Sequence, residues 1–253
     1  MRLNKTSSQS GNVLIYTLIG IVLFAAVMFS ISKNNDDSSG LALKGNAKLE
    51  AQQILDYSRK VESGVQKLLA KGCSESQISF ENSLVTGYAN PNSPSAGDRR
   101  CWVFDPAGAG IPFKKPNIKA LDSTKSASAG FGQYNYSGVM NFPGVGTSTA
   151  CGPDDMKSKE LTMFVPYVTK EVCLNLAQLT STSYNGSIVK DHNISYWPGQ
   201  FYYTGTFSSS FCGAELSDTI TADLFNGKTS GCYEGDNTPA SGTYHFFQVL
   251  VAR

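Results

Sequence analysis

An apolar run near the N-terminus, VLIYTLIGIVLFAAVMFSI at residues 13–31, sets the strongest limit on the fold of this chain. Tyr16 carries the only ionisable side chain in this run. A helix of this length would extend about 28 Å, close to the thickness of the hydrocarbon core of a bilayer. Water solvates such a segment poorly, so it must be a signal peptide, a membrane anchor, or a helix that packs against other helices.

The charges on either side of the run predict its orientation. Arg2 and Lys5 precede it, whereas Asp36 and Asp37 follow it. The positive side of a spanning segment stays inside, so we expect an N-terminus inside and export of the remaining chain. The run is longer than the apolar core of a secretory signal peptide, although the small residues around Ser32 would also suit cleavage there.

The sequence GNVLIYTLIGI, which begins at Gly11, resembles the N-terminus of type IV pilins and pseudopilins. In that family, prepilin peptidase removes a short polar leader that ends in Gly, and an apolar helix follows. The resemblance implies a leader at residues 1–11, a mature and N-methylated terminus at Asn12, and a transmembrane and assembly helix at residues 12–32. The residues implied in assembly are Val13, Leu14, Ile15, Tyr16, Leu18 and Ile19.

The resemblance also implies partners and a location. The partners would be other pilin-like subunits, prepilin peptidase and the inner membrane. The protein would be a single-pass inner-membrane protein, with its head in the periplasm or on an extracellular filament. Cleavage after Gly11, cleavage after Ser32 and retention of the segment all remain open at this point.

Two positions depart from the family pattern. Asn12 stands where pilins usually have Phe or Met, and Tyr16 stands where they usually have Glu. That Glu neutralises the terminal ammonium of a neighbouring subunit inside the apolar bundle. A subunit without the carboxylate would bury an uncompensated charge when stacked in bulk. The resemblance therefore implies a minor subunit rather than a major one.

A polar stretch, KNNDDSSG at residues 33–40, follows the apolar run and predicts a break in the helix. Helical periodicity resumes over residues 41–72, where small and apolar residues recur at alternating spacings of four and three. Gly72 is placed as a C′ glycine that ends this amphipathic helix. We expect the helix to pack through one stripe, formed by Ala47, Ala51, Ile54, Ser58, Val61, Val65 and Leu68.

Six cysteines lie outside the apolar run, and none forms the close pairs typical of zinc sites. An even number of cysteines in an exported chain indicates disulfides formed in an oxidising compartment. Several pairings are open. We favour the pairing of sequence neighbours, which is Cys73–Cys101, Cys151–Cys173 and Cys212–Cys232.

From residue 73 onward, segments rich in β-branched and aromatic residues alternate with turn-forming clusters. The chain has 24 glycines and only 16% charged residues, which favours a turn-rich β domain. We predict an α+β fold, with a long N-terminal hydrophobic helix and a mainly antiparallel β, disulfide-tied globular head at residues 73–253. The strand-like segments are residues 77–88, 101–106, 137–142, 160–168, 199–207 and 244–253, with a short helix at 168–181.

Little in the sequence indicates catalysis. The 21 basic and 20 acidic residues nearly balance, so charge gives no reason to expect a nucleic-acid partner. His245 lies in the last strand-like segment, where we expect a structural role. Asp191 precedes His192 and could orient it as a base, but such an adjacency often occurs by chance. The chain contains no phosphate-binding loop, nucleophile elbow or H-E-x-x-H motif. We therefore expect neither an enzyme nor a cofactor.

A calcium ion is the one ligand for which the sequence offers weak candidates. Glu234, Asp236 and Asn237 cluster the oxygen donors that hard cations prefer, but they do not match an EF-hand loop.

These patterns predict a structural subunit of a type IV pilus-like or pseudopilus filament that packs through its N-terminal helix. The alternative is a single-pass, membrane-anchored extracytoplasmic binding or adhesion protein. A secreted enzyme is the third hypothesis, and no motif supports it.

Overall fold

The computed structural model describes residues 10–94, 97–146, 159–191, 201–207, 224–236 and 238–253. Within the first helix, the side chains of residues 10–14 and 26–44 are outside this description. The chain divides into two compact units, unit 1 at Met1–Asn46 and unit 2 at Ala47–Arg253. Each unit is described separately below.

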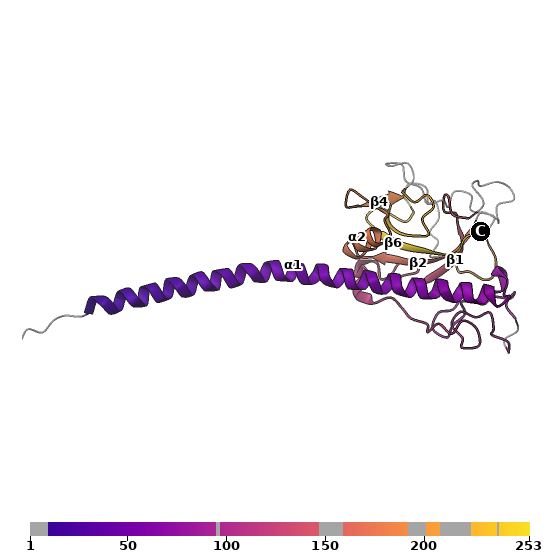
Figure 1. Cartoon of the computed structure of the whole chain (residues 1–253), viewed down its shortest axis with the longest axis horizontal. Helices are drawn as coiled ribbons and strands as arrows, with labels where there is room; N and C mark the ends of the chain where they lie inside the picture. The colour runs from indigo at the N-terminus through magenta and orange to yellow at the C-terminus, as the bar shows by residue number, and fades with distance from the viewer. Residues whose placement is uncertain (1–9, 95–96, 147–158, 192–200, 208–223, 237) are drawn as a thin grey trace, which may run out of the picture. The chain divides into compact units, whose positions relative to one another are not determined.

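The first helix, α1 (Ser10–Ala70), runs through both units (Figure 1). It continues through residues 33–40, so the predicted break is wrong. Asn, Asp and Ser each cost a helix less than about 0.7 kcal/mol and glycine about 1 kcal/mol. Residues 33–40 contain no proline, the residue that removes a hydrogen bond of the helix, so α1 can continue through them.

The expected long hydrophobic helix is also wrong, and with it that part of the predicted fold class. The described side chains of α1 that are both apolar and exposed concentrate in a short segment, residues 15–25. Beyond residue 46 the helix is amphipathic. The predicted stripe of that part is confirmed, because all seven of its residues, from Ala47 to Leu68, are buried.

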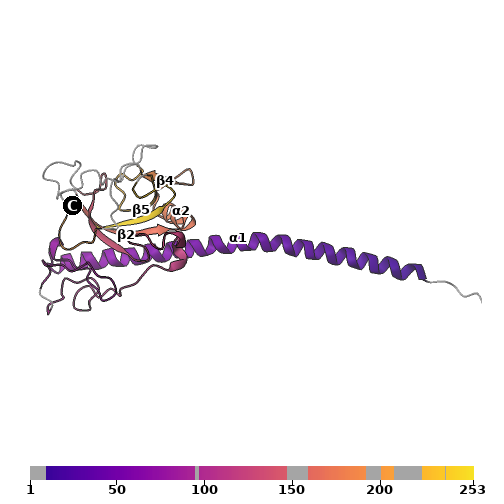
Figure 2. The same ribbon diagram turned by 180° about the vertical axis from the view of Figure 1, so that it is seen from behind.

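In unit 2, residues 47–70 of α1 lie along one face of a β-sheet (Figure 1 and Figure 2). Polar side chains bridge the helix to strand β6 (Tyr244–Val251). Gln66 Nε2 donates to the carbonyl of Leu250 at 2.7 Å, and Gln248 Nε2 donates to Glu62 Oε2 at 3.2 Å. These contacts set the position of the helix along the strand.

Helix α1 ends at the glycine that the sequence predicts. Gly72 has a φ of +92°, the left-handed conformation that glycine adopts without strain. The Cys73 N–H donates to Leu68 O, and the Gly72 N–H donates to Leu69 O. This pair of bonds is the Schellman motif, which satisfies carbonyls left free at the end of a helix.

The sheet contains six strands in the order β1-β2-β6-β5-β4-β3. The β4 and β5 strands are parallel and the other neighbours are antiparallel, so the sheet is mixed rather than purely antiparallel. Strand bounds are β1 (Asn135–Met140), β2 (Glu160–Val168), β3 (Ser183–Tyr184), β4 (Ser187–Asp191), β5 (Ser230–Gly235) and β6 (Tyr244–Val251).

Apolar side chains cover both faces of the central strands. In β6, Phe246 joins the cluster that contains α1, and Phe247 joins a second cluster on the opposite face. In β2, Met163 and Phe164 divide between the clusters in the same way. This alternation is the period of two expected of a strand. Both faces of the central strands are therefore buried, which is why their sequences are nearly continuous apolar runs.

The region between α1 and β1 contains no strand among its described residues. It holds three short 3₁₀ helices, η1 (Glu75–Gln77), η2 (Ile118–Ala120) and η3 (Ser123–Lys125). The strands predicted at residues 77–88 and 101–106 are absent, and only an isolated bridge joins Ser79 to Trp102. Their aromatic residues enter the core from loops: the Phe80 ring stacks on Tyr136 with centroids 4.1 Å apart.

The second helix, α2 (Lys170–Leu179), confirms the predicted short helix. The Thr169 side chain accepts a hydrogen bond from the Val172 N–H and caps its N-terminus. Cys173 of α2 is buried and forms a disulfide with Cys232 of β5. This bond ties the helix directly to the sheet.

The disulfides confirm one predicted pair and contradict the other two. Cys73–Cys101 forms as predicted. Because Cys173 pairs with Cys232, neither Cys151–Cys173 nor Cys212–Cys232 can exist in this structure. Cys151 and Cys212 lie outside the described residues. The prediction failed because sequence proximity does not determine which cysteines a sheet brings together.

Candidate assembly surface and a polar pocket

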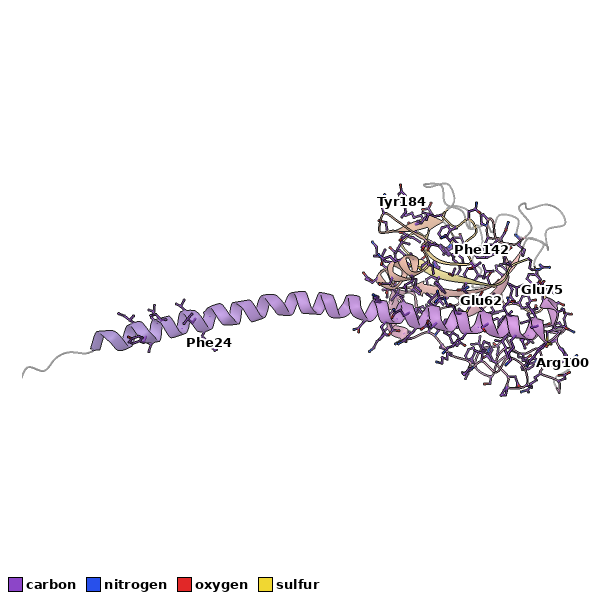
Figure 3. All side chains as sticks on the ribbon, in the orientation of Figure 1. Phe24, Glu62, Glu75, Arg100, Phe142 and Tyr184 are labelled. Atoms are coloured by element: carbon purple, nitrogen blue, oxygen red, sulfur yellow. A yellow bond between two sulfur atoms is a disulfide. The ribbon has the colours of Figure 1, made fainter. Side chains whose placement is uncertain are left out.

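The candidate assembly surface is the apolar segment of α1 at residues 15–25. Phe24 projects outward from the helix in Figure 3. Even the least exposed large side chain of the segment, Ile19, keeps 49% of its surface accessible. The large apolar side chains exposed here are Ile15, Tyr16, Leu18, Ile19, Ile21, Val22, Leu23 and Phe24.

These side chains surround the helix rather than forming one stripe. Consecutive residues of an α-helix point about 100° apart, so the run from Ile21 to Phe24 alone covers most of the circumference. A helix that is apolar all round is stable only when it is surrounded by other apolar groups. Burying one such side chain contributes roughly 1.5–3 kcal/mol. The segment can therefore drive association with several neighbours at once.

The predicted processing site lies at the beginning of the same helix. Gly11 and Asn12 belong to α1, which begins at Ser10. Their side chains, and those of Val13 and Leu14, lie outside the described residues. Tyr16 is described, and 67% of its surface is exposed.

Within the part of α1 whose side chains are described, no segment is long and apolar enough to cross a bilayer. This finding contradicts the predicted location, a single-pass inner-membrane protein with its head in the periplasm or on an extracellular filament. A helix over residues 15–25 extends about 16 Å, roughly half of a hydrocarbon core.

The two described calcium candidates already have a cationic partner. Lys190 Nζ lies 3.5 Å from Glu234 Oε1 and 3.7 Å from Asp236 Oδ1. The Gly242 N–H also donates to Glu234 Oε1 at 3.1 Å. A cation at this position would have to displace the lysine. Asn237 is outside the described residues, and those that are described contain no group of three or more His, Cys, Asp or Glu side chains arranged to hold a metal.

His245 occupies a buried site in β6. Its Nδ1 accepts from the Tyr167 N–H at 3.4 Å, so Nε2 carries the proton and donates to Thr243 Oγ1 at 2.7 Å. Thr243 Oγ1 in turn donates to Ala240 O at 2.6 Å. This chain of hydrogen bonds gives the imidazole a structural role. His192 lies outside the described residues.

Unit 2 also contains a polar pocket of about 330 Å³ that the sequence did not reveal. Side chains from α1, from the loop at residues 112–117 and from the residue before β1 meet there. No motif links these residues, because they come together only when the loop packs along the helix. We call this the α1–loop pocket. Its walls are Glu50, Gln53, Ile54, Asp56, Tyr57, Lys60, Lys114, Lys115, Asn117 and Tyr134.

Comparison of the chain with protein-family models, with curated proteins and with solved structures finds no match.

Proposed function

We propose that this protein is a structural subunit, and a minor one, of a type IV pilus-like or pseudopilus filament. Its subunits associate through the apolar segment of α1 at residues 15–25, and prepilin peptidase removes the leader after Gly11. The observation that carries the proposal is the apolar, exposed surface on all sides of that segment. Copies of the same helix are well suited to cover it, because a bundle encloses each helix from several directions.

Two further features support the proposal. The sequence GNVLIYTLIGI places a Gly boundary and a T-L-I core where pilins have them. Unit 2 has the character of a displayed domain, since its core is continuous, its sheet is buried on both faces and two disulfides tie it together.

Tyr16 is the reason for proposing a minor subunit. A phenol cannot neutralise the terminal ammonium of a neighbour as a carboxylate does. A subunit repeated along the whole filament would bury that charge at every level, whereas a subunit at the tip would not.

The proposal predicts that a charge within the apolar segment prevents self-association. Leu18→Lys places an ammonium where 64% of the side chain is exposed in the single chain, so the chain itself should still fold. In the associated state that ammonium would be surrounded by apolar groups, which is strongly unfavourable. We expect sedimentation velocity of the full chain, after detergent is removed, to show large assemblies for the natural sequence and small species for the variant.

Leu84→Lys is the matched control. Leu84 belongs to unit 2 and is 65% exposed, so the two substitutions make the same chemical change at equally exposed positions. The control variant should assemble as the natural sequence does. Equal assembly of the two variants, or unchanged assembly of Leu18→Lys, would show that the apolar segment is not the contact surface.

A further inference from the structure

We propose that the α1–loop pocket binds one saccharide unit that carries a carboxylate, such as a uronic acid. The inference goes beyond the filament proposal and rests on a different part of the molecule. The residues that line the pocket all lie in unit 2.

The apolar part of the pocket is a pair of tyrosine rings. Tyr57 and Tyr134 have ring centroids 4.6 Å apart, and the buried side chain of Ile54 lies beside them in the lining. Tyr57 Oη donates to Pro112 O and accepts from the Lys114 N–H, each at 3.1 Å. These two bonds attach the loop to α1 and fix the orientation of the ring. Both tyrosines are buried, and the parts of the two rings that reach the pocket form a rigid apolar wall, which suits the C–H groups of a sugar ring.

Tyr134 supplies an unused donor. Only 4% of the residue is exposed, yet no hydrogen bond to its hydroxyl exists among the described residues. Burial raises the pKa of Tyr134, so the hydroxyl keeps its proton and can donate. The hydroxyl oxygen is not among the fully buried unpartnered atoms of the described residues, so it reaches the pocket, where an acceptor on a ligand can pair with it.

Glu50 supplies an acceptor in the same pocket. The residue is 9% exposed, and its Oε1 accepts from Asn117 Nδ2 at 2.7 Å. Its Oε2 has no hydrogen-bond partner in the described part of the chain. Of these two groups, a simple anion could use only the Tyr134 donor, and a simple cation only the Glu50 acceptor. Sugar hydroxyls both donate and accept, so a polyhydroxyl ligand satisfies the two together.

The charge of the lining favours an acidic sugar over a neutral one. Lys60, Lys114 and Lys115 are exposed around the pocket and outnumber the two carboxylates, Glu50 and Asp56. A carboxylate on the ligand would gain charge-assisted hydrogen bonds from these ammonium groups. The pocket volume is at the lower end of the range for small-ligand sites, which fits one sugar ring.

The test is a titration of the full chain with galacturonate, glucuronate, galactose and sulfate, followed by calorimetry and by saturation-transfer NMR. We expect saturable binding of at least one uronate at millimolar concentration, about tenfold tighter than galactose. Tyr134→Phe removes only the unpartnered hydroxyl, so its melting temperature should not change, while its affinity for the uronate should fall about tenfold. Lys114→Ala should also weaken binding, and Lys119→Ala, which changes an exposed lysine outside the pocket, should not.

Several outcomes would overturn the inference. They are the absence of saturable binding by either uronate, an affinity for sulfate or for galactose equal to that for the uronate, and an unchanged affinity for the uronate in Tyr134→Phe. None of these outcomes depends on filament formation, so they can be distinguished from a failure of the assembly experiment.

Discussion

Among single residues, His245 makes the stability of unit 2 depend on pH. Burial lowers its pKa from 6.5 to about 3. The folded protein therefore keeps a neutral imidazole at pH values where the unfolded chain binds a proton. Stability from this residue is complete above pH 6.5 and decreases as the pH falls toward 3. Between pH 6.5 and pH 5 the loss is about 2 kcal/mol, because one pKa unit corresponds to 1.36 kcal/mol.

Urea unfolding of the natural sequence and of His245→Gln, each at pH 7 and pH 5, measures this contribution. We expect the free energy of unfolding to fall between these pH values by about 2 kcal/mol more in the natural sequence than in the variant. The same decrease in both proteins would mean that His245 is not the group responsible.

Glu160 contributes stability with the opposite dependence on pH, because its contribution is lost as the pH rises. Burial raises its pKa from 4.5 to about 8, although the hydrogen bond from the Phe142 N–H to Oε2 and the nearby cations Lys159 and Arg253 act to lower it. The folded state keeps a proton that the unfolded chain releases above pH 4.5. Stability from this group is therefore complete below pH 4.5 and is lost as the pH rises through 8.

Glu160→Gln should remove that loss, because the amide has a similar shape and never ionises. Its carbonyl oxygen can still accept from the Phe142 N–H. At pH 8.5 we expect the variant to be more stable than the natural sequence by about 4 kcal/mol, and at pH 4.5 nearly equal. Urea midpoints at the two pH values test this, and a variant that is less stable at pH 8.5 would contradict it.

Among the elements, the disulfides connect parts that are distant in sequence. Cys173–Cys232 closes a loop over a sequence separation of 59, and Cys73–Cys101 one of 28. In the chain-entropy model these loops correspond to about 4 and about 3.5 kcal/mol of stability. We expect Cys173→Ala combined with Cys232→Ala to lower the free energy of unfolding by about 4 kcal/mol, measured with urea under oxidising conditions.

The pairing also has a consequence for Cys151 and Cys212. Four of the six cysteines are already paired. Within one chain the remaining two can pair only with each other. Peptide mapping without reduction should therefore detect a Cys151–Cys212 peptide together with the other two, and free thiols at both positions would contradict this.

The elements that could be predicted from the sequence are those in which local pattern and tertiary burial agree. Strand β2 is rich in β-branched and aromatic residues and is buried along nearly its whole length, and helix α2 carries a helical period with its apolar side buried. Strand β5, with the sequence SGCYEG, has two glycines and no apolar alternation. It is a strand because β4 and β6 pair with it on both sides, which the local sequence does not contain.

At the scale of the whole molecule, the proposed function depends on where the mature chain begins. Cleavage by prepilin peptidase predicts a mature N-terminus at Asn12. Mass spectrometry of the protein from its native source would give that residue directly, and an added N-methyl group would support the pilin-like assignment. A start at Lys33 would remove the assembly surface and so exclude the filament proposal.

The features that depend only on neighbouring residues could be predicted from the sequence. These include the buried stripe of α1, the glycine that ends it and the apolar segment around Leu18, because periodicity and backbone preference act over a few residues. Three other features became visible only in the folded chain, namely the partner of Cys173, the parallel pairing of β4 with β5 and the proximity of Glu50 and Tyr134 in one pocket. These features depend on contacts between segments far apart in the chain, and burial of the whole core selects them.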